Sequence, residues 1–129
     1  MNVTDVKPTV AIVEDDASML RALARLLQTA GYAVKTYGSA AEFLEDCGSS
    51  AIHCLIVDIQ MPGMDGFELA AALAQRGVCF PLLFITAHDS PSAREKAAAA
   101  HALGFLVKPF DPKQLLDAIA LILKPRGAQ

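Results

Sequence analysis

Charged and hydroxyl side chains stand at or just past the ends of four apolar segments of this chain. The segment 54–58 ends on a carboxylate, although its other residues are suited to burial. Segments 9–13, 81–86 and 105–108 end in a similar way. The polar residues at these ends are Glu14, Asp15, Asp16, Asp58, Thr86 and Lys108. Gathered in one place, such a set could bind a cation and a phosphate-like anion together.

The charges of these side chains define that chemistry. Two carboxylates about 4 Å apart repel by about 4 kcal/mol at an effective dielectric constant of about 20, so a cation is required. Hard oxygen ligands with few fixed protein donors suit Mg²⁺, which keeps several of its waters. A lysine and a threonine hydroxyl opposite a metal-bound aspartate would neutralise a transferred phosphoryl group. Asp58 would then be the nucleophile that becomes an aspartyl phosphate.

Each of these residues also has an ordinary structural interpretation. Asp15 or Asp16 could cap the helix that follows, and we expect Asp16 to do so. Asp58 could be a loop acid, and Thr86 and Lys108 could be a strand former and a solvated charge. We favour the chemical interpretation because the ordinary ones would place all the polar strand ends on one rim by chance.

Five apolar or β-rich segments alternate with stretches of helical periodicity. The segments are 9–13, 33–37, 54–58, 81–86 and 105–108. This alternation predicts an α/β fold with a parallel sheet covered by helices. Segment 33–37 alternates in polarity and suits an edge strand, whereas the first, third and fourth segments are apolar throughout, as inner strands are. Sites in such sheets form beyond the carboxyl ends of the strands.

Capping signals indicate where the helices begin and end. Two pairs have the spacing of a capping box, namely Ser39 with Glu42 and Asp111 with Gln114. Proline follows the cap at Ser90-Pro91 and at Asp111-Pro112. Gly48 and Gly77 stand where the second and third helices should end.

Composition narrows the classes of protein to consider. The 129 residues are 53% hydrophobic with a net charge of −3, which suits one domain with a real core. No lysine or arginine cluster is present, so we expect no direct nucleic-acid binding. Neither a signal peptide nor a membrane-length apolar run is visible, and a soluble, cytoplasmic protein without membrane contact is expected.

Histidines and cysteines do not have the spacing of a zinc site. His53, His88 and His101 are scattered along the chain. We interpret His53 as a surface residue beside a strand, and His88 as a residue that could modulate the site next to Thr86. The cysteines, which we interpret as small buried residues in a reducing compartment, are Cys47, Cys54 and Cys79.

Four stretches of the chain resemble the receiver domain of two-component response regulators, most closely receivers of the nitrogen-fixation type. They are IVEDDASMLRALARLL, CLIVDIQMPGMDGFEL, FITA and GFLVKPFD. The resemblance covers about residues 9–123 of a single domain, 1–129. It implies a flavodoxin-like, doubly wound (βα)5 fold with parallel strands in the order 2-1-3-4-5.

The resemblance also implies a role for each site residue. Asp58 would accept the phosphoryl group from a sensor histidine kinase. Thr86 would hydrogen-bond that group, Lys108 would pair with it, and Phe105 would be the switching aromatic. The implied Mg²⁺ ligands are Glu14, Asp15, Asp58 and the backbone carbonyl of Gln60. The Lys108–Pro109 peptide bond would be cis.

Two positions depart from the family pattern. Glu14 stands where many receivers have aspartate, which should shift the outer shell of the metal without abolishing binding. His101 stands where glycine is common, so we expect a left-handed backbone there, or a shifted helix end.

The predicted function is that of a phospho-acceptor in a phosphorelay. Phosphorylation would change the face formed by the fourth helix, fifth strand and fifth helix, to which an output domain or protein would bind. A phosphorylation-dependent homodimer is left open. The protein would catalyse only its own phosphorylation and dephosphorylation, and is not otherwise an enzyme.

Alternatives to that prediction remain open. We favour a stand-alone receiver over one excised from a two-domain, DNA-binding transcriptional regulator. An aspartate-nucleophile phosphatase is less favoured, because Gln60 occupies the place of its second acid. A receiver-shaped module that is never phosphorylated is also less favoured, because Asp58, Thr86 and Lys108 are all present.

Overall fold

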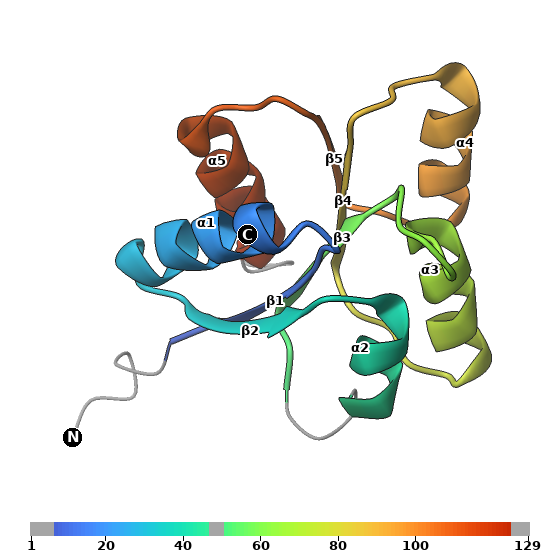
Figure 1. Cartoon of the computed structure of the whole chain (residues 1–129), viewed down its shortest axis with the longest axis horizontal. Coiled ribbons are helices and arrows are strands. Elements are labelled where there is room, and N and C mark those ends of the chain that lie inside the picture. Colours follow the sequence, from blue (N-terminus) through green and yellow to red (C-terminus); the bar gives the residue numbers. More distant parts are fainter. Residues whose placement is uncertain (1–6, 47–50, 125–129) are drawn as a thin grey trace.

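The computed structural model describes residues 7–46 and 51–124, in which five strands alternate with five helices (Figure 1). The strands are β1 (Thr9–Val13), β2 (Ala33–Tyr37), β3 (Cys54–Asp58), β4 (Leu82–Thr86) and β5 (Gly104–Val107). The helices are α1 (Ala17–Thr29), α2 (Ala40–Asp46), α3 (Gly66–Gln75), α4 (Pro91–Ala99) and α5 (Pro112–Leu123). The expected strands are confirmed, with shifts of one residue in β4 and β5.

The strands form one parallel sheet in the order β2-β1-β3-β4-β5, as predicted. The register pairs Val13 of β1 with Val57 of β3, so the next residue of each segment, Glu14 and Asp58, emerges at the same edge. β2 and β5 are the edge strands, whereas β3 and β4 are buried along their whole length. This topology supplies the shared rim that the strand-end residues need.

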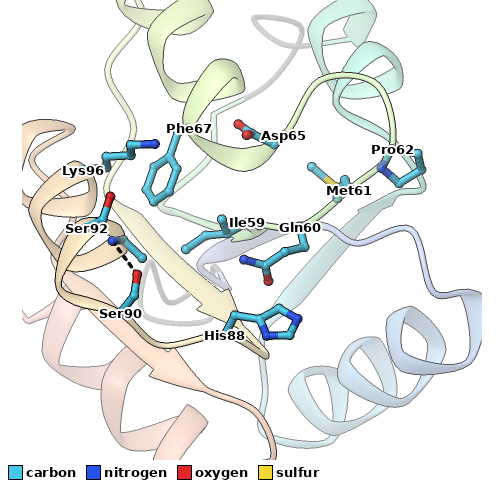
Figure 2. A pocket seen from close by; sticks show the side chains of 11 residues that line it. Ile59, Gln60, Met61, Pro62, Asp65, Phe67, His88, Ser90, Ser92 and Lys96 are labelled. Atoms are coloured by element: carbon cyan, nitrogen blue, oxygen red, sulfur yellow. Dashed lines mark hydrogen bonds between the residues drawn. The ribbon is translucent and has the colours of Figure 1, made fainter.

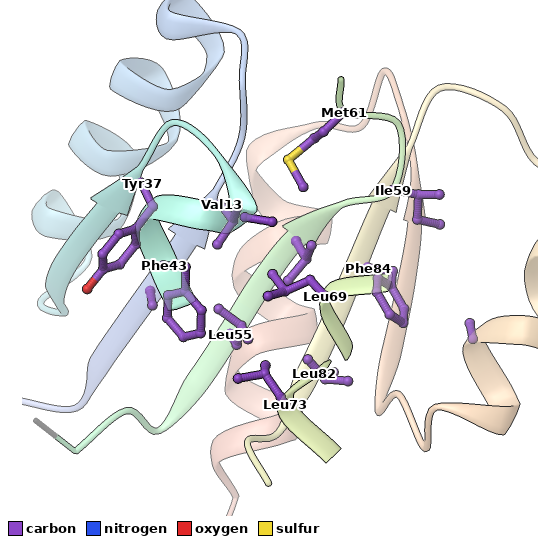
Figure 3. Close-up of a cluster of buried hydrophobic side chains, with 14 residues drawn as sticks. Val13, Tyr37, Phe43, Leu55, Ile59, Met61, Leu69, Leu73, Leu82 and Phe84 are labelled. Atoms are coloured by element: carbon purple, nitrogen blue, oxygen red, sulfur yellow. The ribbon is translucent and has the colours of Figure 1, made fainter. Parts of the chain in front are cut away.

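Helices cover both faces of the sheet, and a separate apolar cluster lies on each face. α1 and α5 pack on one face, where Leu27, Leu115 and Ile119 are fully buried. α2, α3 and α4 pack on the other face, where Figure 3 shows Phe43, Leu69 and Phe84 among the buried side chains. The alternating faces of the inner strands are thus both withdrawn from water, which explains their continuous apolar sequence.

Most of the predicted caps are confirmed. Asp16 accepts from Ser18 N–H and Met19 N–H at the start of α1. Ser90 caps α4 before Pro91, and a complete capping box begins α5, formed by Asp111 and Gln114. The predicted box at α2 is only half formed. Ser39 Oγ accepts from Glu42 N–H, but the Glu42 carboxylate accepts from Gly38 N–H instead of from Ser39.

The backbone conformations inferred from sequence are also present. His101 has a φ of 60°, the left-handed value expected there, and Gly77 follows α3 with a φ of 72°. The Lys108–Pro109 bond is cis. Gly48 lies outside the described residues, and α2 is described as far as Asp46.

The cysteine prediction is wrong at one position. Cys54 is buried in β3, and burial raises the pKa of its thiol to about 12. Cys79 is exposed instead, because it lies in the loop between α3 and β4. Cys47 lies outside the described residues.

Among the described residues, no helix combines the length and the apolar character that a membrane crossing requires.

Candidate functional site: an acidic cluster with one lysine

Three carboxylates meet at the carboxyl edge of the sheet. Glu14 follows β1 directly, and its N–H donates to the carbonyl of Tyr37 in β2, 3.0 Å away. Asp58 is the last residue of the neighbouring strand β3. Glu14, Asp15 and Asp58 each place a carboxylate oxygen within 4.8 Å of the other two. The structure thus brings together the three predicted acidic ligands, while Asp16 is used as a helix cap.

Lys108 lies directly against this cluster. Its Nζ donates to Glu14 Oε1 at 2.9 Å and to Asp58 Oδ2 at 3.1 Å. Its backbone N–H donates to the carbonyl of Thr86 at 2.7 Å, which holds the start of the β5–α5 loop beside the end of β4. The ammonium group therefore neutralises part of the acidic charge from a fixed direction.

Burial and pairing act in opposite directions on these charges. The pKa of Glu14 is raised, first by burial, and the hydrogen bond from Lys108 only partly offsets this. Burial alone would lower the pKa of Lys108, but its hydrogen bonds to Glu14 and Asp58 outweigh burial and raise the pKa. Glu14 is 1% exposed, so a second cation near it would relieve an unfavourable buried charge.

The β3–α3 loop brings backbone close to Asp58. Ile59 N–H donates to Ile85 O, and Gly66 N–H donates back to Ile59 O, so the loop is closed at its base. A Cβ atom on Gly66 would lie 2.8 Å from the carbonyl oxygen of Asp58, and only glycine permits this approach. Gln60 N–H donates to Asp58 Oδ1 at 3.2 Å. The role of the Gln60 carbonyl as a metal ligand stays a prediction.

Thr86 ends β4 as a fully buried polar residue. Its hydroxyl donates to Gln60 Oε1 at 2.7 Å and accepts from His88 N–H at 3.0 Å. The predicted partner of this hydroxyl is a phosphoryl group, so the carboxamide of Gln60 is an additional finding. From the sequence, the Gln60 side chain was considered only as the neutral replacement for the second acid of a phosphatase.

Phe105 lies half-buried on β5, and a cation covers its ring. The guanidinium carbon of Arg94 lies 4.6 Å from the ring centroid. The same guanidinium pairs with both carboxylate oxygens of Asp89, at 2.8 and 3.1 Å. Asp89 belongs to the loop that follows Thr86. The side chains of Asp89 and Arg94 therefore link this loop to the ring of Phe105.

A cavity of about 630 Å³ opens beside the site, between the β3–α3 loop and the start of α4. Figure 2 shows the Gln60 carboxamide extending from that loop toward the end of β4, where the exposed His88 lies. His53 is exposed at the start of β3, as expected, and its Nδ1 accepts from Thr9 N–H.

The donor set fits a hard, hydrated divalent cation. All three clustered ligands are carboxylates, and Asp15 is exposed, so water can complete the coordination. Lys108 donates to one oxygen each of Glu14 and Asp58. The other oxygen of each accepts one backbone N–H, from Asp16 and Gln60, and keeps a lone pair for a metal or for chemistry.

Comparison with known families agrees with this geometry. The sequence model of the family described as the response regulator receiver domain matches residues 10–120. The chain belongs to this family.

Receivers of several regulators are similar to this one. The response regulator protein TmoT of Ectopseudomonas mendocina is 39% identical over 123 residues, which make up 95% of this chain and 56% of that protein. The DNA-binding transcriptional regulator NtrC of Escherichia coli K12 is 38% identical over 111 residues, or 86% of this chain and 23% of that protein. The crystal structure of FixJ-N superposes with a TM-score of 0.85 at 31% identity, and the match covers 96% of this chain and 99% of that one.

The matches establish a two-component signalling domain, and response regulators are in general signalling proteins. The receiver described here spans only about half the length of TmoT. TmoT and NtrC therefore carry segments outside the matched receiver.

Sequence reasoning missed three participants at this receiver's rim: the side chains of Gln60, Asp89 and Arg94. A polar residue two positions after the strand-end aspartate was a visible signal for Gln60. Arg94 and Asp89 gave no such signal, because charged residues on a surface helix and in a loop are common.

Proposed function

We propose that this receiver accepts a phosphoryl group on Asp58 from the phosphohistidine of a sensor histidine kinase. The observation that carries the proposal is the Lys108 ammonium, which donates to Asp58 and Glu14 within the acidic cluster. A lone lysine among carboxylates at a strand end can pair with the phosphoryl oxygens as they arrive.

In the transfer, a carboxylate oxygen of Asp58 attacks phosphorus as the phosphorus–nitrogen bond of the kinase histidine breaks. The electron pair of that bond returns to the imidazole, and an oxygen–phosphorus bond forms on Asp58. Lys108 pairs with one phosphoryl oxygen, and Thr86 donates its hydroxyl to another. A Mg²⁺ ion held by Glu14, Asp15, Asp58 and the Gln60 carbonyl would supply positive charge for the phosphoryl oxygens.

The new charge would then act on the neighbouring strand β5, whose Phe105 pairs with Phe84 of β4. A phosphoryl group adds about −1.5 to −2 charges near neutral pH. Thr86 is drawn toward that charge, which makes room for Phe105 to turn inward and changes the α4–β5–α5 face. The receiver would thus have two conformations, and the charge of the phosphoryl group would shift the equilibrium toward the one with Phe105 turned inward.

Several partners follow from this function. A histidine kinase docks at the rim, and an output domain or protein binds the α4–β5–α5 face, as would a second phosphorylated copy in a homodimer. The domain is taken as 1–129 with its core at 9–123, in the cytoplasm. It would catalyse only its own phosphorylation and dephosphorylation.

The name of NtrC, a DNA-binding regulator, favours a second candidate for the whole protein. In that candidate this receiver controls a DNA-binding module, and DNA contact belongs to the module. A phosphatase of small substrates is less favoured, because the neutral carboxamide of Gln60 follows Asp58 where a general acid would be needed.

Acetyl phosphate and Mg²⁺ test the phosphorylation directly. Intact mass should show one added phosphoryl group, and peptide mapping should place it on Asp58. Asp58→Asn should lose the label, because the amide is a poor nucleophile, whereas Asp117→Asn on the exposed face of α5 should keep it. Undiminished labelling of Asp58→Asn would contradict the proposal.

A further inference from the structure

Two hydrogen-bond donors at the end of β4 converge on one oxygen of Gln60. The Thr86 hydroxyl donates to Gln60 Oε1 at 2.7 Å, and Ala87 N–H makes a longer contact with the same oxygen at 3.4 Å. The backbone of Gln60 is fixed at the other side of the site, because its N–H donates to Asp58 Oδ1. The Gln60 side chain therefore crosses from the loop after Asp58 to the residues after β4.

A phosphoryl oxygen on Asp58 would need the same two donors, the Thr86 hydroxyl and Ala87 N–H, as hydrogen-bond partners. Thr86 is fully buried, and its hydroxyl has a single proton to donate. The competing acceptor, the carbonyl of His88, is farther away at 3.2 Å. While the proton is directed at Gln60, it is not directed at a group on Asp58.

We propose that the Gln60 carboxamide is an internal competitor for the phosphoryl group. Its Oε1 occupies the position that a phosphoryl oxygen takes, and it must leave when Asp58 is modified. This inference deepens the proposed function and rests on it. It assigns a positioning role to a side chain whose backbone alone was expected to take part.

A cavity beside Gln60 can accommodate the displaced carboxamide. Gln60 is exposed, and it lines the cavity of about 630 Å³ together with His88 and Ser92 (Figure 2). Water in that cavity can take over the hydrogen bonds of the displaced amide. Displacement therefore costs about one net hydrogen bond, because Oε1 exchanges its protein donors for water.

Beryllium fluoride, a phosphoryl mimic, measures the competition at saturating Mg²⁺. Gln60→Met keeps the length of the side chain and removes the acceptor. The variant no longer has to break one net hydrogen bond before beryllium fluoride binds. Its dissociation constant for beryllium fluoride should therefore be roughly two- to tenfold lower than that of the unmodified protein. Gln75→Met, at the exposed end of α3, is the matched control and should bind like the unmodified protein. Equal or weaker binding by Gln60→Met would overturn the inference.

A second measurement follows the carboxamide itself. In ¹⁵N-labelled protein, the Gln60 side-chain amide signals are those missing from the Gln60→Met spectrum. Saturation with beryllium fluoride should move them toward the positions of a solvated glutamine, and the Gln75 signals should stay in place. Unmoved Gln60 signals would show that the carboxamide is not displaced.

Failure of the proposed phosphorylation and failure of the Gln60 role are distinguishable. If the unmodified protein does not bind beryllium fluoride at all, the proposed phosphorylation fails and the competition fails with it. If it binds normally while Gln60→Met gains no affinity, only the role of Gln60 is wrong.

Discussion

Glu14 is important for the charge balance of the site, because its carboxylate is buried and shares the Lys108 ammonium with Asp58. The side chain also accepts from Asp16 N–H, which fixes it under the start of α1. Glutamate has one methylene more than the aspartate common at this position. The Glu14 carboxylate reaches both the lysine and the backbone, with one oxygen on each.

The raised pKa of Glu14 predicts a pH dependence of stability. The folded protein keeps this proton at pH values where the unfolded chain has lost it. The contribution of Glu14 to the free energy of unfolding is therefore most favourable below pH 4.5 and declines as pH rises through the raised pKa. Glu14→Gln is neutral throughout, so in metal-free buffer its free energy of unfolding relative to the unmodified protein should increase from acid to neutral pH. Urea titrations measure this, with Glu95→Gln as an exposed control; a flat difference would contradict the assignment.

Gly66 permits the closest backbone approach at the site. The Cβ of Gly66→Ala would meet Asp58 O at 2.8 Å and Ile59 Cα at 3.0 Å, and neither is a flexible side-chain end. The change should cost about 1–3 kcal/mol of unfolding free energy, more than the gain in helix propensity. Denaturant unfolding tests this. Gly38→Ala is the control, since its Cβ would approach only the Glu42 carboxylate, at 3.5 Å or more. Equal stability of the two variants would show that the loop can yield.

At the scale of elements, α4 and α5 have the same start but different buried faces. Each begins with a side-chain cap followed by proline. α4 buries only Ala93 and Ala97, whereas α5 buries three large aliphatic side chains, Leu115, Ile119 and Ile122. Because stabilisation scales with the apolar area buried, α4 is held less firmly. A weakly held helix beside Phe105 suits the face that is proposed to change.

Amide hydrogen exchange should detect this difference. In the unphosphorylated protein, α4 amides should exchange faster than those of α5 through local opening. Ser90→Ala removes the α4 cap, at a cost of about 1 kcal/mol, and should accelerate exchange in α4 while leaving α5 unchanged. Equal protection of both helices would contradict weak docking of α4.

At the scale of the whole molecule, the winding of the sheet creates the site. Lys108 and Glu14 are separated by 94 positions, yet their side chains lie 2.9 Å apart. β1 lies between β2 and β3, so the acids after β1 and at the end of β3 share one edge. The cluster exists only when the sheet is assembled, and ligand binding there must therefore stabilise the whole fold.

Addition of Mg²⁺ should raise the melting temperature. A ligand at 100 times its dissociation constant stabilises the native state by about 2.7 kcal/mol. Asp15→Asn should reduce this gain, because it removes one carboxylate of the cluster, whereas Asp117→Asn should retain it. Thermal unfolding with and without Mg²⁺, followed by circular dichroism, measures the effect. An undiminished gain in Asp15→Asn would place the metal elsewhere.

The sequence by itself determined the elements and the residues at their ends. Periodicity and caps are local properties, so β1 and β3, the Asp16 cap and the Asp111 box were predictable from neighbours along the chain. Asp58 was predicted as the nucleophile from its place at a strand end, and the resemblance supplied the strand order and the kinase as phosphoryl donor. The left-handed backbone at His101 was likewise an expectation of that pattern.

Only the tertiary structure decided how side chains from different elements pair. The Thr86–Gln60 bond, the Arg94 guanidinium over Phe105 and the double pairing of Lys108 depend on distances between elements. The exposure of Cys79 depends on packing in the same way. Composition and periodicity do not encode such distances, because they arise when strands far apart in sequence are joined by hydrogen bonds into one sheet.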